Sequence, residues 1–470
     1  MQEIDNISKF KTGIIPIEPT FVGYKQTLDK RAICIFMATG FFLDQDTYYK
    51  EQKVLKPGCK YEINTTTQKI LSEEAYFKWH YSPVDRPFKQ IVDEFAELFE
   101  TIIKEQISDN KVILPLSGGL DSRTQAVALK YLNIPVNSYS YKFQNGHDET
   151  YYGKQIAKIC DFPFQAMTVP KGYLWNSVDE LANITSCYSE FTHSRQMAFI
   201  NQYEALGDVF SLGHWGDVLF DDMNVEDDLS FESQVSFLAN KIVKKGGLEL
   251  AESLWQDWEL KGSFKDYLRK RVSGLLAAIN IPQSANAQIR AFKSLYWAPR
   301  WTSINLSIFQ SKKPITLPYY DNRMCEFICT VPEKYLAGRQ IQIAYIKKRR
   351  PTLAKLTWQA QRPFNLYSYT YNRSPWNLPY RIYNKLRHIT SNEKYIQRNW
   401  ELQFLGSENE KQLENRLFNN PMFTTMISAE VTQKYYDLFK NKDQVFYSHS
   451  VSMLLTLSLF STQELKTTNN

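Results

Sequence analysis

Short apolar runs that lead into glycine-containing polar loops mark the central part of this 470-residue chain. Residues 112–116 are almost entirely apolar, as a central parallel strand requires, and residues 120–132 carry apolar side chains at helical spacings. Residues 135–143 alternate enough to predict another strand, and residues 151–160 follow polar cap residues and predict a helix. Residues 208–222 contain a further apolar run before an acidic loop. This succession predicts a doubly wound α/β fold with a mostly parallel sheet.

The pattern changes on either side of this α/β region. Residues 1–85 are predicted to be β-rich, and residues 376–470 are helical by pattern, which leaves residues 86–375 for the α/β domain. Within the last part, residues 448–460 are strongly apolar. They are fewer than the roughly 20 residues of a membrane span and include serines, so we expect them to pack on the protein, without a membrane span.

The loop after the first apolar run carries the most specific chemistry. It reads Ser117-Gly118-Gly119-Leu120-Asp121-Ser122, and the two glycines allow a sharp turn and a close approach of the backbone to a ligand. The start of a helix presents unpaired N–H groups, which attract anions. The loop is no Walker motif. A turn without a ligand is the alternative, but it does not explain why two serines and an aspartate flank the glycines.

This loop resembles the pyrophosphate loop of the ATP pyrophosphatases, and a second segment narrows the family. Residues 212–220 read Leu-Gly-His-Trp-Gly-Asp-Val-Leu-Phe and resemble the matching loop of the asparagine synthetase and β-lactam synthetase group. The resemblance implies that Ser117, Gly118, Gly119, Ser122 and Gly213 bind the nucleotide. It also implies that Asp121 and Asp217 hold Mg²⁺ between the phosphates of ATP, because this ion takes one or two carboxylates.

Two departures from the family pattern fall in the second segment. His214 stands where relatives carry Glu or Tyr, and Val218 replaces the usual Glu. A neutral imidazole can accept a proton from an attacking amine, so His214 is a candidate catalytic base. A histidine that only forms a hydrogen bond within the loop is an equal alternative.

The resemblance extends to three more segments. Residues 140–142 are expected near adenine. Residues 317–333 resemble the family's Arg-x-Pro-Phe-Leu-Asp…Leu-Pro stretch, but the first Arg is missing, which leaves open how a substrate carboxylate is recognised. Lys347 is our choice for the catalytic lysine that stabilises charge on the departing pyrophosphate. It belongs to a run of four cations, residues 347–350, and any of the four could be the one aligned with the family's lysine. The run is also compatible with a solvated helix face.

The N-terminal region resembles a shortened glutaminase. Glutamine-dependent relatives carry a catalytic Cys after the initiator Met, whereas this chain has Gln2. Residues 39–43 and the strands after the Pro57-Gly58 turn resemble the final strands of that domain. We interpret residues 1–85 as a β-rich remnant that cannot release ammonia from glutamine.

Composition excludes some classes. A net charge of +6 over 470 residues is mild, and no basic block indicates a nucleic-acid partner. Six cysteines without paired spacing, together with a start that lacks signal-peptide features, favour buried reduced thiols and a cytoplasmic location.

The resulting functional hypothesis is an ATP- and Mg²⁺-dependent ligase that adenylates a small-molecule or peptide carboxylate and joins it to ammonia or an amine. A separate protein that supplies the amine or carries the substrate is a possible partner. The alternative is a catalytically inactive relative that binds nucleotide or serves as a scaffold. A tRNA-modifying ATP pyrophosphatase fits less well, because it shares only the first loop.

Overall fold

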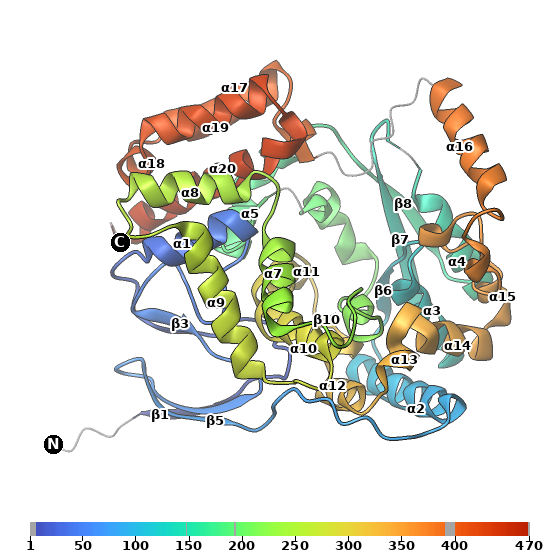
Figure 1. The fold of residues 1–470 in the computed structure, drawn as a ribbon. Coiled ribbons are helices and arrows are strands. Elements are labelled where there is room, and N and C mark those ends of the chain that lie inside the picture. Colours follow the sequence, from blue (N-terminus) through green and yellow to red (C-terminus); the bar gives the residue numbers. More distant parts are fainter. Residues whose placement is uncertain (1–5, 147, 192–193, 391–399, 469–470) are drawn as a thin grey trace.

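The protein is built around a five-stranded parallel sheet (Figure 1). The computed structural model describes residues 6–146, 148–191, 194–390 and 400–468. The strand order is β10-β9-β6-β7-β8, and every pairing between neighbours is parallel. The strands are β6 (Val112–Pro115), β7 (Val136–Phe143), β8 (Phe164–Val169), β9 (Val209–Ser211) and β10 (Ile315–Thr316). This sheet confirms the predicted doubly wound α/β fold with a mostly parallel sheet.

The strand order places a topological switch between β6 and β9. The chain runs from β6 outward through β7 to β8, and then returns to add β9 on the other side of β6. Val112 pairs with Val209, and Ile113 pairs with Phe210. Because ligands of open α/β sheets bind at the carboxyl ends of strands at such a switch, the loops after β6 and β9 are positioned to share one site.

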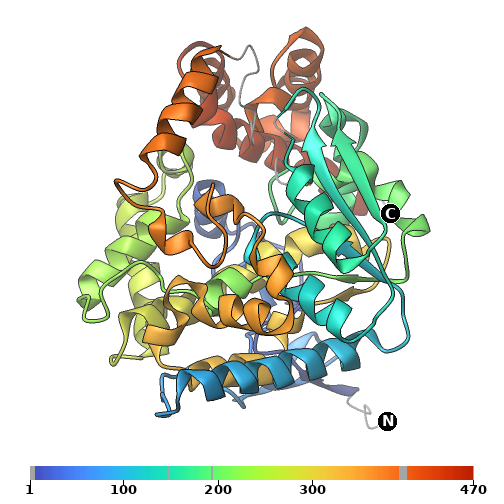
Figure 2. The same ribbon diagram turned by 90° about the vertical axis from the view of Figure 1, so that its right-hand side faces the viewer.

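Helices cover both faces of the sheet (Figures 1 and 2). One face carries α2 (Phe88–Ile107), α3 (Leu120–Tyr131), α4 (Thr150–Cys160) and α14 (Gln340–Arg349). The other face packs against the 3₁₀ segment η2 (Arg195–Ala205) and α11 (Ser303–Gln310). There, the ring centroids of Phe210 and Phe309 lie 5.0 Å apart. Burial on both faces explains why the central strands are apolar throughout.

The N-terminal region is β-rich, as predicted, but it also contains a buried helix. An antiparallel sheet has the order β1-β4-β5, and a second one pairs β2 with β3. The strands are β1 (Ile7–Lys11), β2 (Phe21–Gly23), β3 (Gln52–Val54), β4 (Cys59–Asn64) and β5 (Lys69–Ala75). The hairpin of β4 and β5 confirms the strands expected after the Pro57-Gly58 turn.

The strand expected at residues 39–43 is wrong. Helix α1 (Lys30–Thr39) occupies this region, because Asp29 caps its start by accepting hydrogen bonds from two backbone N–H groups. The helix ends at Gly40, whose φ of 79° is left-handed and whose N–H donates to the carbonyl of Phe36 at 2.7 Å. An apolar run that seemed strand-like is therefore a helix C-terminus and the loop that follows it.

The N-terminal region shares its hydrophobic core with the end of the chain. Helix α1 packs against α8 (Gly247–Asp257), and a Cβ at Gly247 would lie only 2.4 Å from the carbonyl oxygen of Ala38. Tyr48 stacks on Phe460 of α20 (Gln444–Thr468) with centroids 3.8 Å apart. Residues 451–460 are all buried, so the apolar run near the C-terminus packs inside the protein as predicted.

The remaining helices surround this core and complete the surface. They are α5 (Val178–Thr185), α6 (Gly216–Leu219), α7 (Phe231–Ile242), α9 (Phe264–Ile279), α10 (Ala285–Phe292), α12 (Asn322–Cys329), α13 (Glu333–Leu336), α15 (Pro351–Ala354), α16 (Leu378–Thr390), α17 (Ser407–Phe418), α18 (Pro421–Met426) and α19 (Ala429–Asn441). The last four, with α20, confirm the helical C-terminal part.

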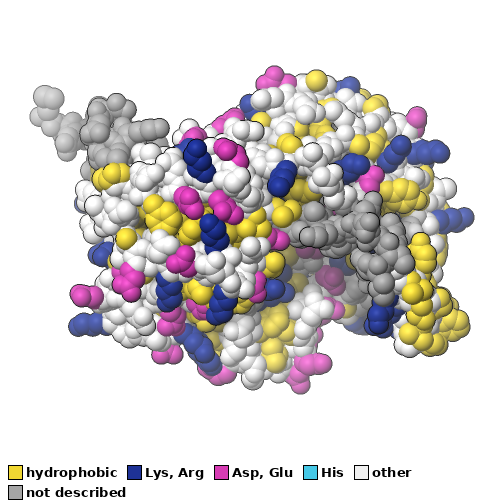
Figure 3. Space-filling view, turned by 90° about the horizontal axis from the view of Figure 1, so that it is seen from above, with side chains coloured by type: hydrophobic (Ala, Val, Ile, Leu, Met, Phe, Trp, Pro, Cys, Tyr) yellow, Lys and Arg dark blue, Asp and Glu magenta, His cyan; other side chains and the backbone are white. Residues whose placement is uncertain are grey.

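Figure 3 shows positive and negative side chains interspersed over one face of the molecule. All six cysteines are free and buried. None of the described helices has the length and apolar character needed to cross a membrane.

Candidate active site

A cavity of about 570 Å³ lies at the carboxyl edge of the parallel sheet, where β6, β7 and β9 end. Its wall combines residues from these strand ends with residues from the helices that follow α10. The lining residues are Pro115, Leu116, Ser117, Asp121, Ser122, Tyr139, Ser140, Tyr141, Gln196, Leu212, Gly213, His214, Trp215, Asp217, Val218, Lys293, Trp297, Trp301, Thr302 and Phe309.

The first loop, residues 117–122, joins β6 to α3 and is held by its two serines. The hydroxyl of Ser122 accepts a hydrogen bond from the backbone N–H of Ser117 at 3.1 Å and lies 3.1 Å from the Ser117 hydroxyl. The Ser117 hydroxyl accepts from the N–H of Gly119 at 3.3 Å. These bonds fold the loop over the start of α3, where helix N–H groups favour a negatively charged ligand.

The second loop, residues 212–217, joins β9 to α6 and touches the first loop directly. A Cβ at Gly213 would lie 2.9 Å from the Cβ of Asp121, and a Cβ at Gly216 would lie 2.2 Å from Asp121 Oδ1. Both glycines are therefore required for the two loops to meet. Trp215, with a left-handed φ of 75°, donates from its indole nitrogen to the hydroxyl of Ser294 at 3.0 Å.

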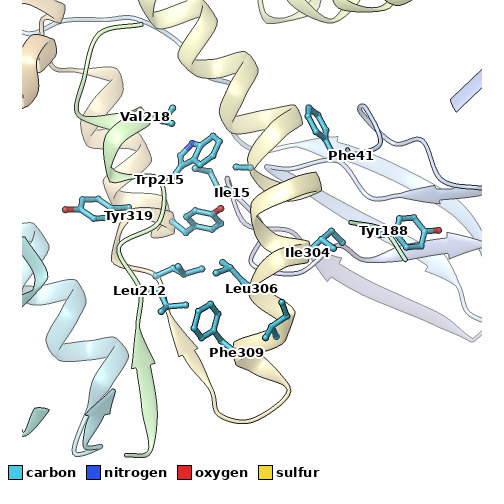
Figure 4. Close-up of a cluster of buried hydrophobic side chains, with 14 of the residues drawn as sticks. Ile15, Phe41, Tyr188, Leu212, Trp215, Val218, Ile304, Leu306, Phe309 and Tyr319 are labelled. Carbon is cyan, nitrogen blue, oxygen red and sulfur yellow. The ribbon is translucent and has the colours of Figure 1, made fainter. Parts of the chain in front are cut away.

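Apolar packing fixes the second loop from the other side. Figure 4 shows Leu212 and Trp215 extending from the loop toward the helical segment that carries Leu306 and Phe309. All four side chains are buried. The loop is thus held between the start of α3 and the helices on the opposite face, which keeps the cavity wall in place.

The two predicted metal ligands both line the cavity. Asp121 is paired with the Arg339 guanidinium and accepts a hydrogen bond from Gln342 Nε2 at 3.2 Å, both at Oδ1. Burial raises the pKa of Asp121 to about 6, the charge of Arg339 acts to lower it, and the nearby Asp217 carboxylate raises it further. Asp217 is exposed to the cavity.

This donor set fits Mg²⁺. Two carboxylates face one cavity, and the charge of Asp217 acts to raise the pKa of Asp121, so the two groups lie close enough to interact. The contacts of Asp121 with Arg339 and Gln342 both use Oδ1. Mg²⁺ prefers such oxygen ligands together with phosphate oxygens and water.

His214 lines the cavity between the two loops. Its Nδ1 is buried and has no hydrogen-bond partner among the described residues. Burial lowers the pKa of His214 to about 4, although the charge of Asp217 acts in the opposite direction. The imidazole is therefore neutral near pH 7, and its free ring nitrogen is able to accept a proton.

Most of the residues predicted from the two loops meet in this cavity. Ser117, Asp121, Ser122, Gly213, His214 and Asp217 all belong to its lining. Gly118 lies beneath other groups, because a Cβ there would meet Gln359 at 2.5 Å and Tyr152 at 2.9 Å. Gly119 is the residue that precedes α3.

The strand expected to contact adenine contributes only part of its residues. Ser140 and Tyr141 of β7 line the cavity. Lys142 lies instead 3.7 Å from a carboxylate oxygen of Asp148. The nucleotide base is thus expected beside the first two of these residues.

Lys347 is not among the residues that line the cavity. Its Nζ lies 4.9 Å from the centre of the Tyr367 ring. The neighbouring cations form structural contacts: Lys348 pairs with Asp93 at 2.5 Å, and Arg349 with Glu100 at 2.7 Å. The catalytic role of Lys347 stays a prediction.

The sequence did not predict three polar residues at this site, Arg339, Gln342 and Lys293. Arg339 and Gln342 contact Asp121 from the start of α14, a few residues before the basic run at residues 347–350. Lys293 lines the cavity from a π-helix, Lys293–Thr302. Gly338 is a sequence signal for a turn just before Arg339, whereas no local motif marks Lys293 as a site residue.

Comparison with known proteins agrees with this geometry. Residues 94–280 match the asparagine synthase family model. The matched segment includes both loops of the cavity and ends before Lys293.

The solved structures that match include NMN synthetase from Francisella tularensis. It is 14% identical, with 44% of this chain and 93% of that chain covered and a TM-score of 0.23. No curated protein matches the chain.

Proposed function

We propose that this asparagine synthase-like protein adenylates a carboxylic acid with ATP, releases pyrophosphate, and converts the acyl adenylate to an amide with ammonia or an amine. The observation that carries this proposal is the meeting of Asp121, Asp217 and the serine-glycine loop in one cavity at the switch point of the sheet. In the first step a carboxylate oxygen attacks the α-phosphorus of ATP, and pyrophosphate leaves.

The first loop supplies the phosphate site. The N–H groups at the start of α3, together with Ser117 and Ser122, bind the pyrophosphate part of ATP, and Tyr141 lies beside the base. Asp121 and Asp217 would hold Mg²⁺, which supplies charge neutralisation for the phosphate oxygens when bound. Arg339 lies beside these carboxylates and adds a fixed cation near the developing negative charge.

The second step forms the amide. The amine attacks the acyl carbon, and its nitrogen becomes strongly acidic as the new C–N bond forms. The bond between the acyl carbon and the phosphate oxygen then breaks, and AMP leaves with that oxygen. His214, which lines the cavity, is the proposed acceptor of this proton. Free ammonia or an amine is the proposed nitrogen source. We place this reaction in the cytoplasm, where the six free thiols stay reduced.

Isotope exchange tests the adenylation step. The protein is incubated with Mg·ATP, labelled pyrophosphate and a pool of carboxylic acids, and label incorporation into ATP is measured. Asp121→Asn and Asp217→Asn should each reduce exchange and Mg²⁺-dependent ATP binding by roughly 100-fold or more, as the loss of a metal ligand implies.

A matched control keeps this test specific. Asp228 is exposed and lies outside the cavity lining, so Asp228→Asn should retain exchange and binding. If both cavity variants bind ATP with the affinity and Mg²⁺ dependence of the wild type, the shared site is refuted. Formation of ADP and phosphate in place of AMP and pyrophosphate would refute adenylation.

The ion pair of Arg339 with Asp121 favours one alternative. A built-in guanidinium on a predicted metal ligand is compatible with a relative that binds nucleotide without Mg²⁺ and without turnover. This alternative predicts ATP binding that is unchanged by chelation of Mg²⁺ and no exchange with any acid.

A further inference from the structure

The cavity contains a lysine that the proposed reaction has not used. Lys293 extends from the start of the π-helix, and its Nζ lies 6.0 Å from the Trp215 ring centre and 5.8 Å from that of Trp297. Its other close contact is with the Met223 sulfur at 3.9 Å. None of the salt bridges between described residues involves Lys293. Burial lowers the pKa of Lys293, while the charges of Asp217 and Asp221 act in the opposite direction, but neither carboxylate forms an ion pair with it. Burying such a cation is costly, and an anionic ligand in the cavity would reduce this cost.

The wall around Lys293 is aromatic. Trp215, Trp297 and Trp301 line this part of the cavity, and Phe309 closes it toward the sheet. Trp297 is itself supported by Phe41, with ring centroids 5.5 Å apart and planes within 16°. Flat apolar groups pack well on such rings, and a single charged group then fixes their orientation.

Acidic groups are scarce in the same cavity. Of its described lining residues, only Asp121 and Asp217 are acidic, and both are assigned to the metal. An α-amino acid substrate would bury an ammonium group that needs an acidic or carbonyl partner of its own. The lining therefore favours an acid that carries no ammonium group.

Together these observations name the substrate class of the proposed site. We infer that Lys293 binds the carboxylate of an aromatic acid without an α-amino group, whose ring lies against Trp297 and Trp301. This inference rests on the proposed function. It also explains how an acid is held although the first Arg of the family's Arg-x-Pro-Phe stretch is absent, with Thr316 in its place. Lys293 and both tryptophans lie beyond residues 94–280, the segment that matches the family model.

Binding of defined probes, measured without turnover, tests the inference. Saturation-transfer NMR titrations with Mg²⁺ and a non-hydrolysable ATP analogue would compare 3-phenylpropanoate with its neutral amide, with hexanoate and with L-phenylalanine. The wild type should bind 3-phenylpropanoate most tightly. Lys293→Met should weaken this binding by roughly 10- to 100-fold, the worth of a hydrogen-bonded charge. Trp297→Leu should reduce the preference over hexanoate by roughly 2- to 10-fold.

Lys244 provides the matched control. Its Nζ also lies 5.8 Å from the Trp297 ring centre, and its pKa is likewise lowered by burial, but it does not line the cavity. Lys244→Met should therefore leave probe binding unchanged. Lys293→Arg keeps the positive charge and should retain most of the probe binding. If it does, the loss of binding in Lys293→Met is caused by the lost charge and is not a general effect of substitution at this position.

Several outcomes would overturn the inference. They are equal binding of the acid and its amide, tighter binding of L-phenylalanine, no binding of any aromatic acid, or unchanged binding in Lys293→Met. Loss of nucleotide binding in that variant would instead place Lys293 on the phosphates. Failure of the proposed function is a separate result, because it appears as absence of pyrophosphate exchange even when the acid and ATP both bind.

Discussion

Single residues decide whether the two loops can form one site. Asp121 lies against the backbone of the second loop, and no side chain fits at Gly216 between Asp121 and the Tyr319 ring. The sequence predicts a close approach of the backbone to a ligand at Gly118 and Gly119 of the first loop. In the structure, Gly213 and Gly216 of the second loop are the glycines that approach Asp121.

The first prediction concerns this contact. A Cβ in Gly216→Ala would lie 2.2 Å from Asp121 Oδ1 and 2.8 Å from Tyr319, so Asp121 must shift. We expect Mg²⁺-dependent ATP binding to be lost and the free energy of unfolding to fall by about 1–3 kcal/mol. Titration calorimetry and urea denaturation measure the two effects.

Gly274 is the control for this substitution. It lies in α9, is exposed, and a Cβ there would meet no atom within 4 Å. Gly274→Ala should bind ATP normally and should be more stable by up to about 1 kcal/mol, because alanine favours a helix. Normal ATP binding by Gly216→Ala would show that the loops move freely.

The second prediction separates the two half-reactions at His214. Adenylation involves no amine, so His214→Ala should still exchange pyrophosphate into ATP while amide formation falls by roughly 10²–10⁴-fold. Because burial lowers the pKa of His214 to about 4, the neutral base persists from pH 5.5 upward. Its protonation should therefore cause no inflection in the rate of amide formation between pH 5.5 and 8.

Exchange assays and product analysis across this pH range check the prediction. His80→Ala serves as the control, since His80 is exposed and outside the cavity lining. A parallel fall of exchange and amide formation would place His214 in the nucleotide site. An inflection near pH 6.5 that disappears in His214→Ala would contradict the lowered pKa.

At the scale of elements, the second loop depends on helices that come later in the chain. Arg290 of α10 is buried and donates to the backbone carbonyls of Val218 at 3.1 Å and Asp221 at 2.8 Å. The same guanidinium pairs with the buried Glu333 of α13 at 2.5 and 2.7 Å. This pair ties α10 and α13 to the short helix α6 that begins with Gly216 and Asp217.

The third prediction follows from this buried pair. Glu333→Gln leaves the Arg290 charge without its carboxylate, so we expect a loss of about 3–5 kcal/mol in the free energy of unfolding. Arg290→Met combined with Glu333→Met should lose less than the sum of the single changes, because no charge remains buried. Urea denaturation of the variants completes the double-mutant cycle.

An exposed pair gives the comparison. Arg269 and Glu232 lie 3.0 Å apart with side chains 52% and 71% exposed. Arg269→Met should change stability by no more than about 1 kcal/mol. If Glu333→Gln changes the free energy of unfolding by as little as this, the backbone carbonyls of Val218 and Asp221 alone satisfy Arg290.

Sequence patterns identified elements best where local signals act alone. The strand and helix around the first loop, and the hairpin after Gly58, follow from apolar periodicity and turn residues. The strand prediction at residues 39–43 was wrong because these buried, mostly apolar residues form the end of α1 and the loop after it; the left-handed Gly40 is the local signal of that helix end. Lys293, Arg339 and Gln342 could not be placed at the site, because long-range packing brings them to Asp121 and the cavity.

At the scale of the whole molecule, the proposed remnant of residues 1–85 is joined to the rest through its core. Eight residues of α1 are buried, and Phe36 and Tyr48 belong to an aromatic cluster that reaches Phe460 of α20. Lys244 of the control experiment donates its backbone N–H to Ala38 in the same region. Residues of this N-terminal region are therefore part of the packing of the whole fold.

The fourth prediction tests this shared core. Phe36 is fully buried and stacks on Phe42 at 4.5 Å, so Phe36→Ala should cost about 3–5 kcal/mol, whereas Phe10→Ala, on an exposed part of β1, should cost less than about 1 kcal/mol. If residues 1–85 and the α/β region unfold together, Phe36→Ala shifts a single transition and lowers the temperature at which bound ATP is released. Two separate transitions, with only the earlier one shifted and ATP binding retained through it, would show that the N-terminal region is an independent unit.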